Sequence, residues 1–179
     1  RRDALDQRMA HWLCMAGYMP FPLPNALVLS GVDVFAWLDA LQPNGVLLSG
    51  GNDIGVEAER DTTDRRLLEY AHKHCLPLLG ICRGMQMLGQ WAGGGLTPVV
   101  GHAGTRHELV GELSGKVNSY HCYSLACCPS GFNLLARSKD GCIEAIRHKE
   151  LPWEGWMWHP EREQNSSARD IERFKRLFS

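Results

Sequence analysis

The stretch that decides the fold runs from residue 76 to residue 92 and reads LPLLGICRGMQMLGQWA. Residues 76–81 form a short apolar run bounded by proline and glycine, which predicts a buried strand. Residues 83–92 have the composition of a helix. Cys82 therefore falls at the junction between a strand and a helix, at the carboxyl end of the sheet. Active sites of open α/β sheets lie at this edge.

Two glycines flank this cysteine symmetrically. Gly80 and Gly84 stand two positions to either side of Cys82, as glycines do around the serine of a nucleophile elbow. Small residues suit a tight turn that brings neighbouring backbone close. The following helix N-terminus favours a thiolate and offers N–H groups to an oxyanion. Most free cysteines are simply small buried side chains, and we assign that role to the other six. The pattern predicts that Cys82 is a thiolate nucleophile.

A base and its partner are predicted near the end of the chain. Trp158-His159-Pro160-Glu161 follows an apparent strand at residues 156–158. The residue before proline is held extended, and residues i and i+2 of an extended segment point the same way. Glu161 can then orient the imidazole of His159, as in a catalytic triad with Cys82. A histidine beside a carboxylate is more often an ordinary polar contact, so this prediction depends on the pairing with Cys82.

The rest of the chain alternates between strand and helix patterns. We expect helices at residues 3–16, 32–41, 63–74 and 166–177, an extended segment at 18–23, and strands at 45–49 and near 117–119, 132–136 and 142–146. The 45–49 strand ends in the Gly50-Gly51-Asn52-Asp53 loop. Apart from the strand near 117–119, residues 96–128 are harder to interpret. The alternation predicts one α/β domain over residues 1–179, a three-layer sandwich around a mixed, mostly parallel sheet.

Composition narrows the class of protein. The 179 residues carry 19 Lys and Arg against 20 Asp and Glu, which argues against nucleic acid or an anionic membrane as the main partner. The seven cysteines are odd in number and contain no C-x-x-C pair, so a reducing compartment is expected. We see no signal segment and no apolar run of transmembrane length, and expect a cytoplasmic protein.

No metal or cofactor is expected. His72 and His74 are two residues apart on a predicted helix and do not share a face. His102 and His107 lie in a glycine-rich segment that offers no clear third ligand, whereas zinc sites need three or four. A phosphate-binding glycine loop ending in Lys-Ser or Lys-Thr is absent from the sequence.

Taken together, these motifs resemble the class I glutamine amidotransferases, a family that includes γ-glutamyl hydrolases. The family patterns G-x-C-x-G-x-Q and H-P-E both stand intact here, at residues 80–86 and 159–161. The resemblance covers the chain from about residue 45 to the end and implies a flavodoxin-like fold. The family fold begins with a strand. Here that strand is either absent or hidden within residues 1–23.

The resemblance also implies roles for other residues. The backbone N–H groups of Gly51 and Arg83 would form the oxyanion hole. The remaining implied substrate contacts, made more by backbone than by side chain in residues 117–121, are Gln86, Gly50, Asn52, Ser119, Tyr120 and His121.

Three functions remain open at this stage. The first is hydrolysis of glutamine through a γ-glutamyl thioester on Cys82, with ammonia passed to a separate synthase. The second is a free-standing hydrolase of γ-glutamyl amines, toward which Arg83 and the Val117-Asn118-Ser119-x-His121 pattern lean. The third is a catalytically silent interaction protein. The intact triad argues against the third, and the short chain favours the first.

Overall fold

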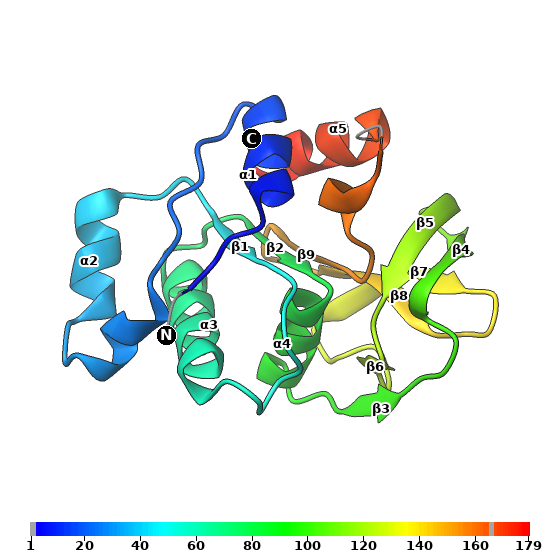
Figure 1. Ribbon diagram of the computed structural model, residues 1–179, viewed down its shortest axis with the longest axis horizontal. Helices are drawn as coiled ribbons and strands as arrows, with labels where there is room; N and C mark the ends of the chain where they lie inside the picture. Colours follow the sequence, from blue (N-terminus) through cyan, green and yellow to red (C-terminus); the bar gives the residue numbers. More distant parts are fainter. Residues whose placement is uncertain (1–2, 165–166) are drawn as a thin grey trace.

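The computed structural model describes residues 3–164 and 167–179, and its centre is a seven-stranded sheet (Figure 1). The strand order is β1-β2-β9-β8-β7-β4-β5. The three strands at one side of the sheet pair in parallel. These are β1 (Val46–Leu48), β2 (Leu78–Ile81) and β9 (Trp153–Trp156). Cys82 and His159 follow two of these three strands, as expected from the sequence.

Helices cover both faces of the parallel strands, which confirms the α/β fold (Figure 1). On one face lie α1 (Gln7–Met15) and α5 (Ala168–Leu177). On the other lie α3 (Ala58–Lys73) and α4 (Arg83–Trp91). At the outside of α3 are η1 (Asn25–Leu29) and α2 (Val34–Leu41). None of the described helices is both long and apolar enough to cross a bilayer.

The remaining strands correct the expectation of a mostly parallel sheet. All their pairings in the large sheet are antiparallel, including that of β8 with β9. The strands are β4 (Ala103–Gly111), β5 (Gly115–Tyr120), β7 (Phe132–Ser138) and β8 (Ile143–His148). Short turns join β4 to β5 and β7 to β8, and such turns can only connect antiparallel strands. A separate small sheet pairs β3 (Leu96–Pro98) with β6 (Tyr123–Leu125).

Several element boundaries differ from the expected ones. Helix α3 begins at Ala58 instead of residue 63, and its first turn is closed by the hydrogen bond from Asp61 N–H to the Glu57 carbonyl at 3.0 Å. Helix α1 begins only at Gln7, capped by Asp6. Strand β9 ends at Trp156. No strand is assigned within residues 3–24, and residue 166 of the expected last helix lies outside the described residues.

The junction of β2 with α4 depends on Gly80 and Gly84. Backbone atoms of neighbouring segments occupy the space that a side chain at either position would need. A Cβ on Gly84 would lie 2.0 Å from the carbonyl oxygen of Leu48, and one on Gly80 would lie 2.6 Å from the backbone of Gly84. Both distances are far shorter than any van der Waals contact. Helix α4 therefore starts in direct backbone contact with β1, as expected of a tight turn.

This contact predicts that Gly84→Ala strongly destabilises the fold. The clash is with backbone, which cannot rotate away, so we expect a loss of at least about 2 kcal/mol in the free energy of unfolding. Urea denaturation followed by circular dichroism measures it. Gly95→Ala is the matched control, because the nearest atom to its Cβ, in Ala126, is 4.0 Å away. Equal stability of the two variants would contradict the prediction.

Candidate active site

Cys82 is held in a strained backbone conformation at the end of β2. Its φ of 52° and ψ of −105° lie outside the regions that residues with a side chain normally adopt. The Cys82 N–H donates to the carbonyl of Trp156 at 2.7 Å, and the Cys82 carbonyl accepts from Gln86 N–H at 3.1 Å. Strain of this kind persists only where the surrounding structure holds it, and it is typical of functional sites.

The surroundings of the Cys82 thiol work against the expected thiolate. Burial raises the pKa of this thiol to about 12, because an anion there would lose its hydration. The backbone N–H of Arg83 and the charge of Arg162 oppose this effect but are weaker. The helix N-terminus thus does not by itself generate a thiolate. A neighbouring base has to remove the proton when a substrate is bound.

His159 and Glu161 form the expected pair. The Nδ1 atom of His159 lies 2.6 Å from Oε1 of Glu161, and both side chains are buried. His159 has extended φ/ψ, and Pro160 opens the short helix η2 (Pro160–Arg162) that carries Glu161. Because a carboxylate accepts the Nδ1–H proton, Nε2 remains available as a base. The Tyr120 ring packs edge-on against the imidazole, with ring centres 5.7 Å apart.

Asn118 contacts the backbone of His159, a role that we did not assign to it when it was named in the pattern of residues 117–121. Its Oδ1 accepts the His159 N–H at 2.9 Å, and its Nδ2 donates to the His159 carbonyl at 2.8 Å. The same Nδ2 also donates to Glu163. One buried amide thus fixes both backbone polar groups of His159. The available signal was an asparagine between Val117 and Ser119 in a predicted strand, a position where asparagine is uncommon.

The glycine loop after β1 lies against these residues. A Cβ on Gly50 would meet the His159 ring at 2.4 Å, so this glycine makes room for the imidazole. A Cβ on Gly51 would meet the guanidinium of Arg60 at 2.4 Å. Arg60 in turn donates to the Ser49 carbonyl at 2.8 Å. Asn52 is exposed. The assignment of Gly51 N–H to an oxyanion hole stays a prediction.

Arg83 contributes through its backbone and its side chain in different ways. Its N–H is at the first position of α4 and interacts with the Cys82 sulfur, which is where an oxyanion donor has to be. Its side chain points away, into buried ion pairs with Asp61 and Asp64 of α3. The arginine after the nucleophile therefore joins two helices.

Three of the residues implied as substrate contacts use their side chains for hydrogen bonds within the protein. Gln86 donates to the Tyr123 carbonyl at 2.9 Å, and His121 Nδ1 lies 3.0 Å from the same oxygen. Ser119 donates to the His102 carbonyl at 2.5 Å. By contrast, the Tyr120 side chain is exposed and lies beneath the guanidinium of Arg162, 4.8 Å from its ring centre. Contacts from the backbone of residues 119–121 stay a prediction.

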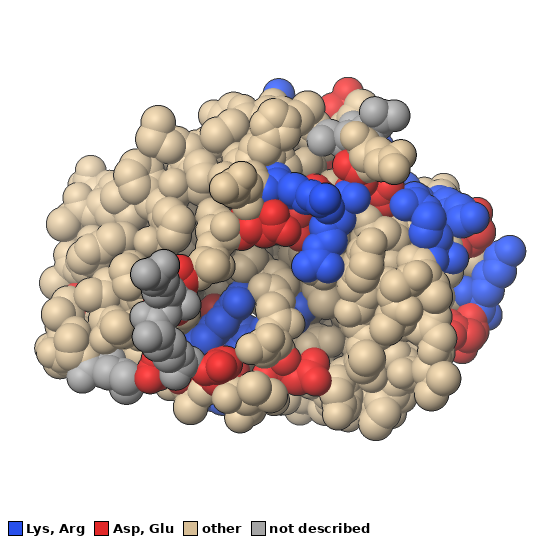
Figure 2. Space-filling model, viewed as in Figure 1, with Lys and Arg blue, Asp and Glu red and all other residues tan. Residues whose placement is uncertain are grey.

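Figure 2 shows a hollow near the middle of the face on which the loop after β1 lies. Basic and acidic side chains stand side by side around it, and neither sign forms a continuous patch on this face. A cavity of about 740 Å³ lies elsewhere, between α2, α3 and residues 17–25, and does not include Cys82, His159 or Glu161.

Comparison with known proteins agrees with these features. Residues 25–176 match the model of the family described as glutamine amidotransferase class-I. The chain is 32% identical to the γ-glutamyl-CDP-amidate hydrolase of Campylobacter jejuni over 140 residues, which are 75% of this chain and 69% of that protein. It is 31% identical to one subunit of the glutamine-hydrolysing GMP synthase of Pyrococcus furiosus over 144 residues, 75% of this chain and 74% of that one.

A solved structure shows the same fold. It is a putative GMP synthase subunit from Thermoplasma acidophilum, which superimposes with a TM-score of 0.78 at 23% identity and covers 96% of this chain and 86% of its own. The family match spans most of the chain and includes both the nucleophile elbow and the His159–Glu161 pair. The chain therefore belongs to the class I glutamine amidotransferase family.

Proposed function

We propose that this chain hydrolyses a γ-glutamyl amide, with glutamine as the first substrate to consider. The observation that carries the proposal is the buried His159–Glu161 pair, whose nitrogen and oxygen are 2.6 Å apart, together with a strained cysteine at a helix N-terminus, at the end of the neighbouring strand β2. Such a pair can take a proton from a neutral thiol and stabilise the imidazolium that results. Cys82 requires this help, because burial raises its pKa to about 12.

The chemistry follows in two steps. The Cys82 sulfur attacks the γ-carbonyl carbon as its proton moves to His159, and His159 then gives the proton to the departing amine. This leaves a γ-glutamyl thioester on the sulfur. His159 next removes a proton from water, which attacks the thioester and releases glutamate and the thiol. The Arg83 N–H, and on our proposal also the Gly51 N–H, stabilise the oxyanion in both steps.

The destination of the amine distinguishes two candidate functions. In the first, ammonia from glutamine passes to a separate synthase, and the similarity to a relative named as a glutamine-hydrolysing GMP synthase subunit supports it. In the second, the chain is a free-standing hydrolase of a substituted γ-glutamyl amide, and the similarity to a relative named as a γ-glutamyl-CDP-amidate hydrolase supports that function. We favour the first as the working assignment.

Kinetics of the isolated chain test this assignment. A glutaminase that serves a synthase should turn over glutamine slowly on its own and should not accept γ-glutamyl-γ-aminobutyrate, whose amine is bulky. We therefore expect a measurable kcat/KM for glutamine alone, abolished in Cys82→Ala, from assays of released ammonia and glutamate. Rapid turnover of the substituted amide with little activity on glutamine would establish the second candidate instead. If neither is hydrolysed, the silent interaction protein becomes the best description.

Cysteine labelling tests the nucleophile. Iodoacetamide at about pH 7 should modify Cys82 more slowly than the exposed cysteines, because a buried thiol of high pKa holds little thiolate. Below its pKa of about 12, the rate at Cys82 should rise about tenfold for each unit of pH. A chloroketone analogue of glutamine should reverse the order and label Cys82 first. Peptide mapping by mass spectrometry measures both, and preferential labelling of another cysteine by the analogue would contradict the assignment.

Asn118 should affect the rate of the chemical step more than substrate binding. Asn118→Ala removes both hydrogen bonds to the His159 backbone, so the imidazole loses its position and kcat should fall about 10²-fold with little change in KM. Asn118→Asp keeps an acceptor for the His159 N–H but sets a carboxylate oxygen against the His159 carbonyl and Glu163, so it should lose at least as much. Asn133→Ala, at an exposed position of β7, is the matched control. A proportional rise in KM at constant kcat would show that Asn118 serves binding.

A further inference from the structure

A second group of chemically reactive side chains lies where two parts of the sheet separate. Strand β4 pairs with β7 only from Leu109 to Gly111, so its first half, paired with β5, leaves the rest of the sheet. The space between this half of β4 and the start of β8 is filled by polar side chains. They are His102 before β4, His107 within β4, His121 after β5 and Glu144 within β8.

The hydrogen bonds of His102 and His121 determine which of their ring nitrogens is unprotonated and can direct its lone pair into this group. His121 Nδ1 lies 3.0 Å from the Tyr123 carbonyl, which can only accept, so Nδ1 carries the proton. His102 Nε2 lies 2.7 Å from Asp140 Oδ2, and the Asp140 carboxylate also accepts from Cys142 N–H. The remaining nitrogens, His102 Nδ1 and His121 Nε2, then point lone pairs at each other across 3.2 Å. Such an arrangement requires a positive charge between them.

Glu144 adds negative charge to the same point. Its side chain is completely buried, and neither carboxylate oxygen has a hydrogen bond within the described part of the chain. Its Oε1 nevertheless lies 3.2 Å from His107 Nε2, 3.5 Å from His102 Nδ1 and 3.6 Å from His121 Nε2. A buried carboxylate costs much free energy unless a cation compensates it. The His107 Nε2 atom is buried and, among the residues described, without a hydrogen bond as well.

These separations are those of ligands around a small metal ion. Nitrogen and oxygen atoms at about 2.0–2.1 Å from a tetrahedral Zn²⁺ stand about 3.3 Å from one another. Four of the six separations among the facing atoms range from 3.2 to 3.6 Å, and the ligand atoms of His102, His107 and Glu144 all lie within 4.8 Å of one another. Three imidazoles and a carboxylate are a donor set suited to zinc and similar borderline metals. We propose that His102, His107, His121 and Glu144 bind one divalent transition-metal ion of the Zn²⁺ type.

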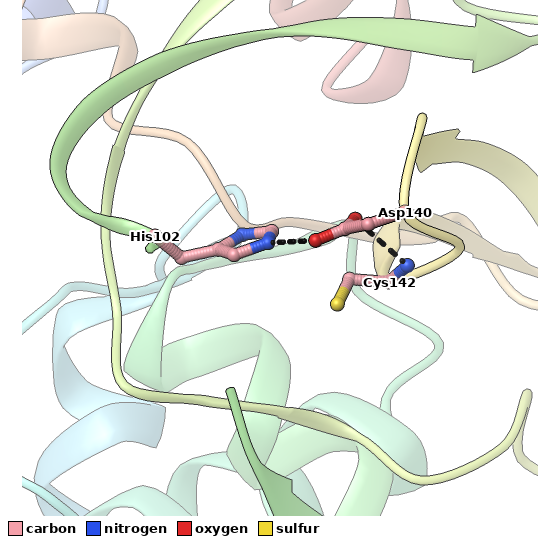
Figure 3. Close-up of side chains that lie close together, drawn as sticks. All are labelled: His102, Asp140 and Cys142. Atoms are coloured by element: carbon pink, nitrogen blue, oxygen red, sulfur yellow. Dashed lines mark hydrogen bonds and ion pairs between the residues drawn. The ribbon is translucent and has the colours of Figure 1, made fainter. Parts of the chain in front are cut away.

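The outer contacts have the form that metal sites require. A ligating histidine almost always donates its other ring N–H to a carboxylate or a backbone carbonyl. Asp140 plays this part for His102, as Figure 3 shows, and the Tyr123 carbonyl plays it for His121. Figure 3 also shows Cys142 beside Asp140, which faces Nε2 of His102. The ligand atoms of His102, Asp140 and Cys142 also lie within 4.8 Å of one another, but Asp140 is exposed and already accepts the His102 proton, so we do not assign the ion to them.

From the sequence, we expected no metal at His102 and His107 for want of a third ligand. The missing ligands come from position 121, just after β5, and position 144, within β8, so no local spacing could reveal them. Four protein ligands leave no open position, so the ion is structural. It links three strands and fixes His121, which is adjacent to the Tyr120 that packs on His159. The site is separate from the proposed hydrolysis and does not depend on it.

Direct metal binding tests the proposal. The full chain, stripped with a chelator and dialysed, should take up about one Zn²⁺ per chain in a calorimetric titration, with the content confirmed by mass spectrometry, and its midpoint of thermal unfolding should rise. Glu144→Gln keeps the shape of the side chain but removes its charge, and should weaken binding at least about tenfold. His121→Asn should weaken it further. Cys142→Ala and His72→Asn, outside the proposed ligand set, should bind as the unaltered chain does.

Two results would overturn the proposal. One is the absence of saturable binding of Zn²⁺, Co²⁺ or Ni²⁺ by the stripped chain, which would mean that a proton supplies the positive charge. The other is loss of binding in Cys142→Ala together with normal binding in Glu144→Gln. That result would place the ion between His102 Nε2, Asp140 and Cys142. If a variant does not fold, the visible spectrum of Co²⁺ bound to the unaltered chain distinguishes the two ligand sets. A tetrahedral visible spectrum without thiolate charge transfer supports the proposed ligands, and a thiolate band contradicts them.

Discussion

The close backbone contact between Gly84 and Leu48 is the constraint on which the active site depends. It lets α4 begin directly at the carboxyl edge of the sheet, with no side chain between helix and strand. The turn that results is so tight that Cys82 adopts a φ of 52°. The hydrogen bond from Cys82 N–H to Trp156 holds this strained residue beside β9. Cys82 and His159 follow β2 and β9, which are neighbours in the sheet, so the proposed nucleophile and base lie at the same edge.

Buried ion pairs between α4 and α3 also hold the junction of β2 with α4. Arg83 is almost completely buried and pairs with two carboxylates of α3, so the helix that follows the nucleophile is tied to the helix that precedes its strand. Buried ion pairs contribute little net stability, but breaking one leaves an uncompensated charge. This arrangement therefore fixes geometry more than it stabilises the fold. The same holds for Asn118, whose amide sets the position of the His159 backbone.

The proposed reaction and the proposed metal site meet at residues 118–123. Asn118 fixes the base, Tyr120 packs on its ring, and His121 belongs to the metal group. The Tyr123 carbonyl accepts hydrogen bonds from both His121 and Gln86, the glutamine of the elbow motif. Through these contacts the segment links His159, which follows the parallel strand β9, to the histidine group beside β4 and β5. Its side chains serve mainly to hold the site together.

The sequence by itself determined the parallel α/β core, the position of Cys82 and the His159–Glu161 pair, because each depends on residues that are adjacent in the chain. Apolar runs, flanking glycines and a histidine before proline are local features. The sequence did not determine the antiparallel strands, the high pKa of Cys82, the role of Asn118 or the grouping of His102, His107, His121 and Glu144. Those depend on burial and on contacts between distant segments, and only the tertiary structure decides which side chains the pairing of strands brings together.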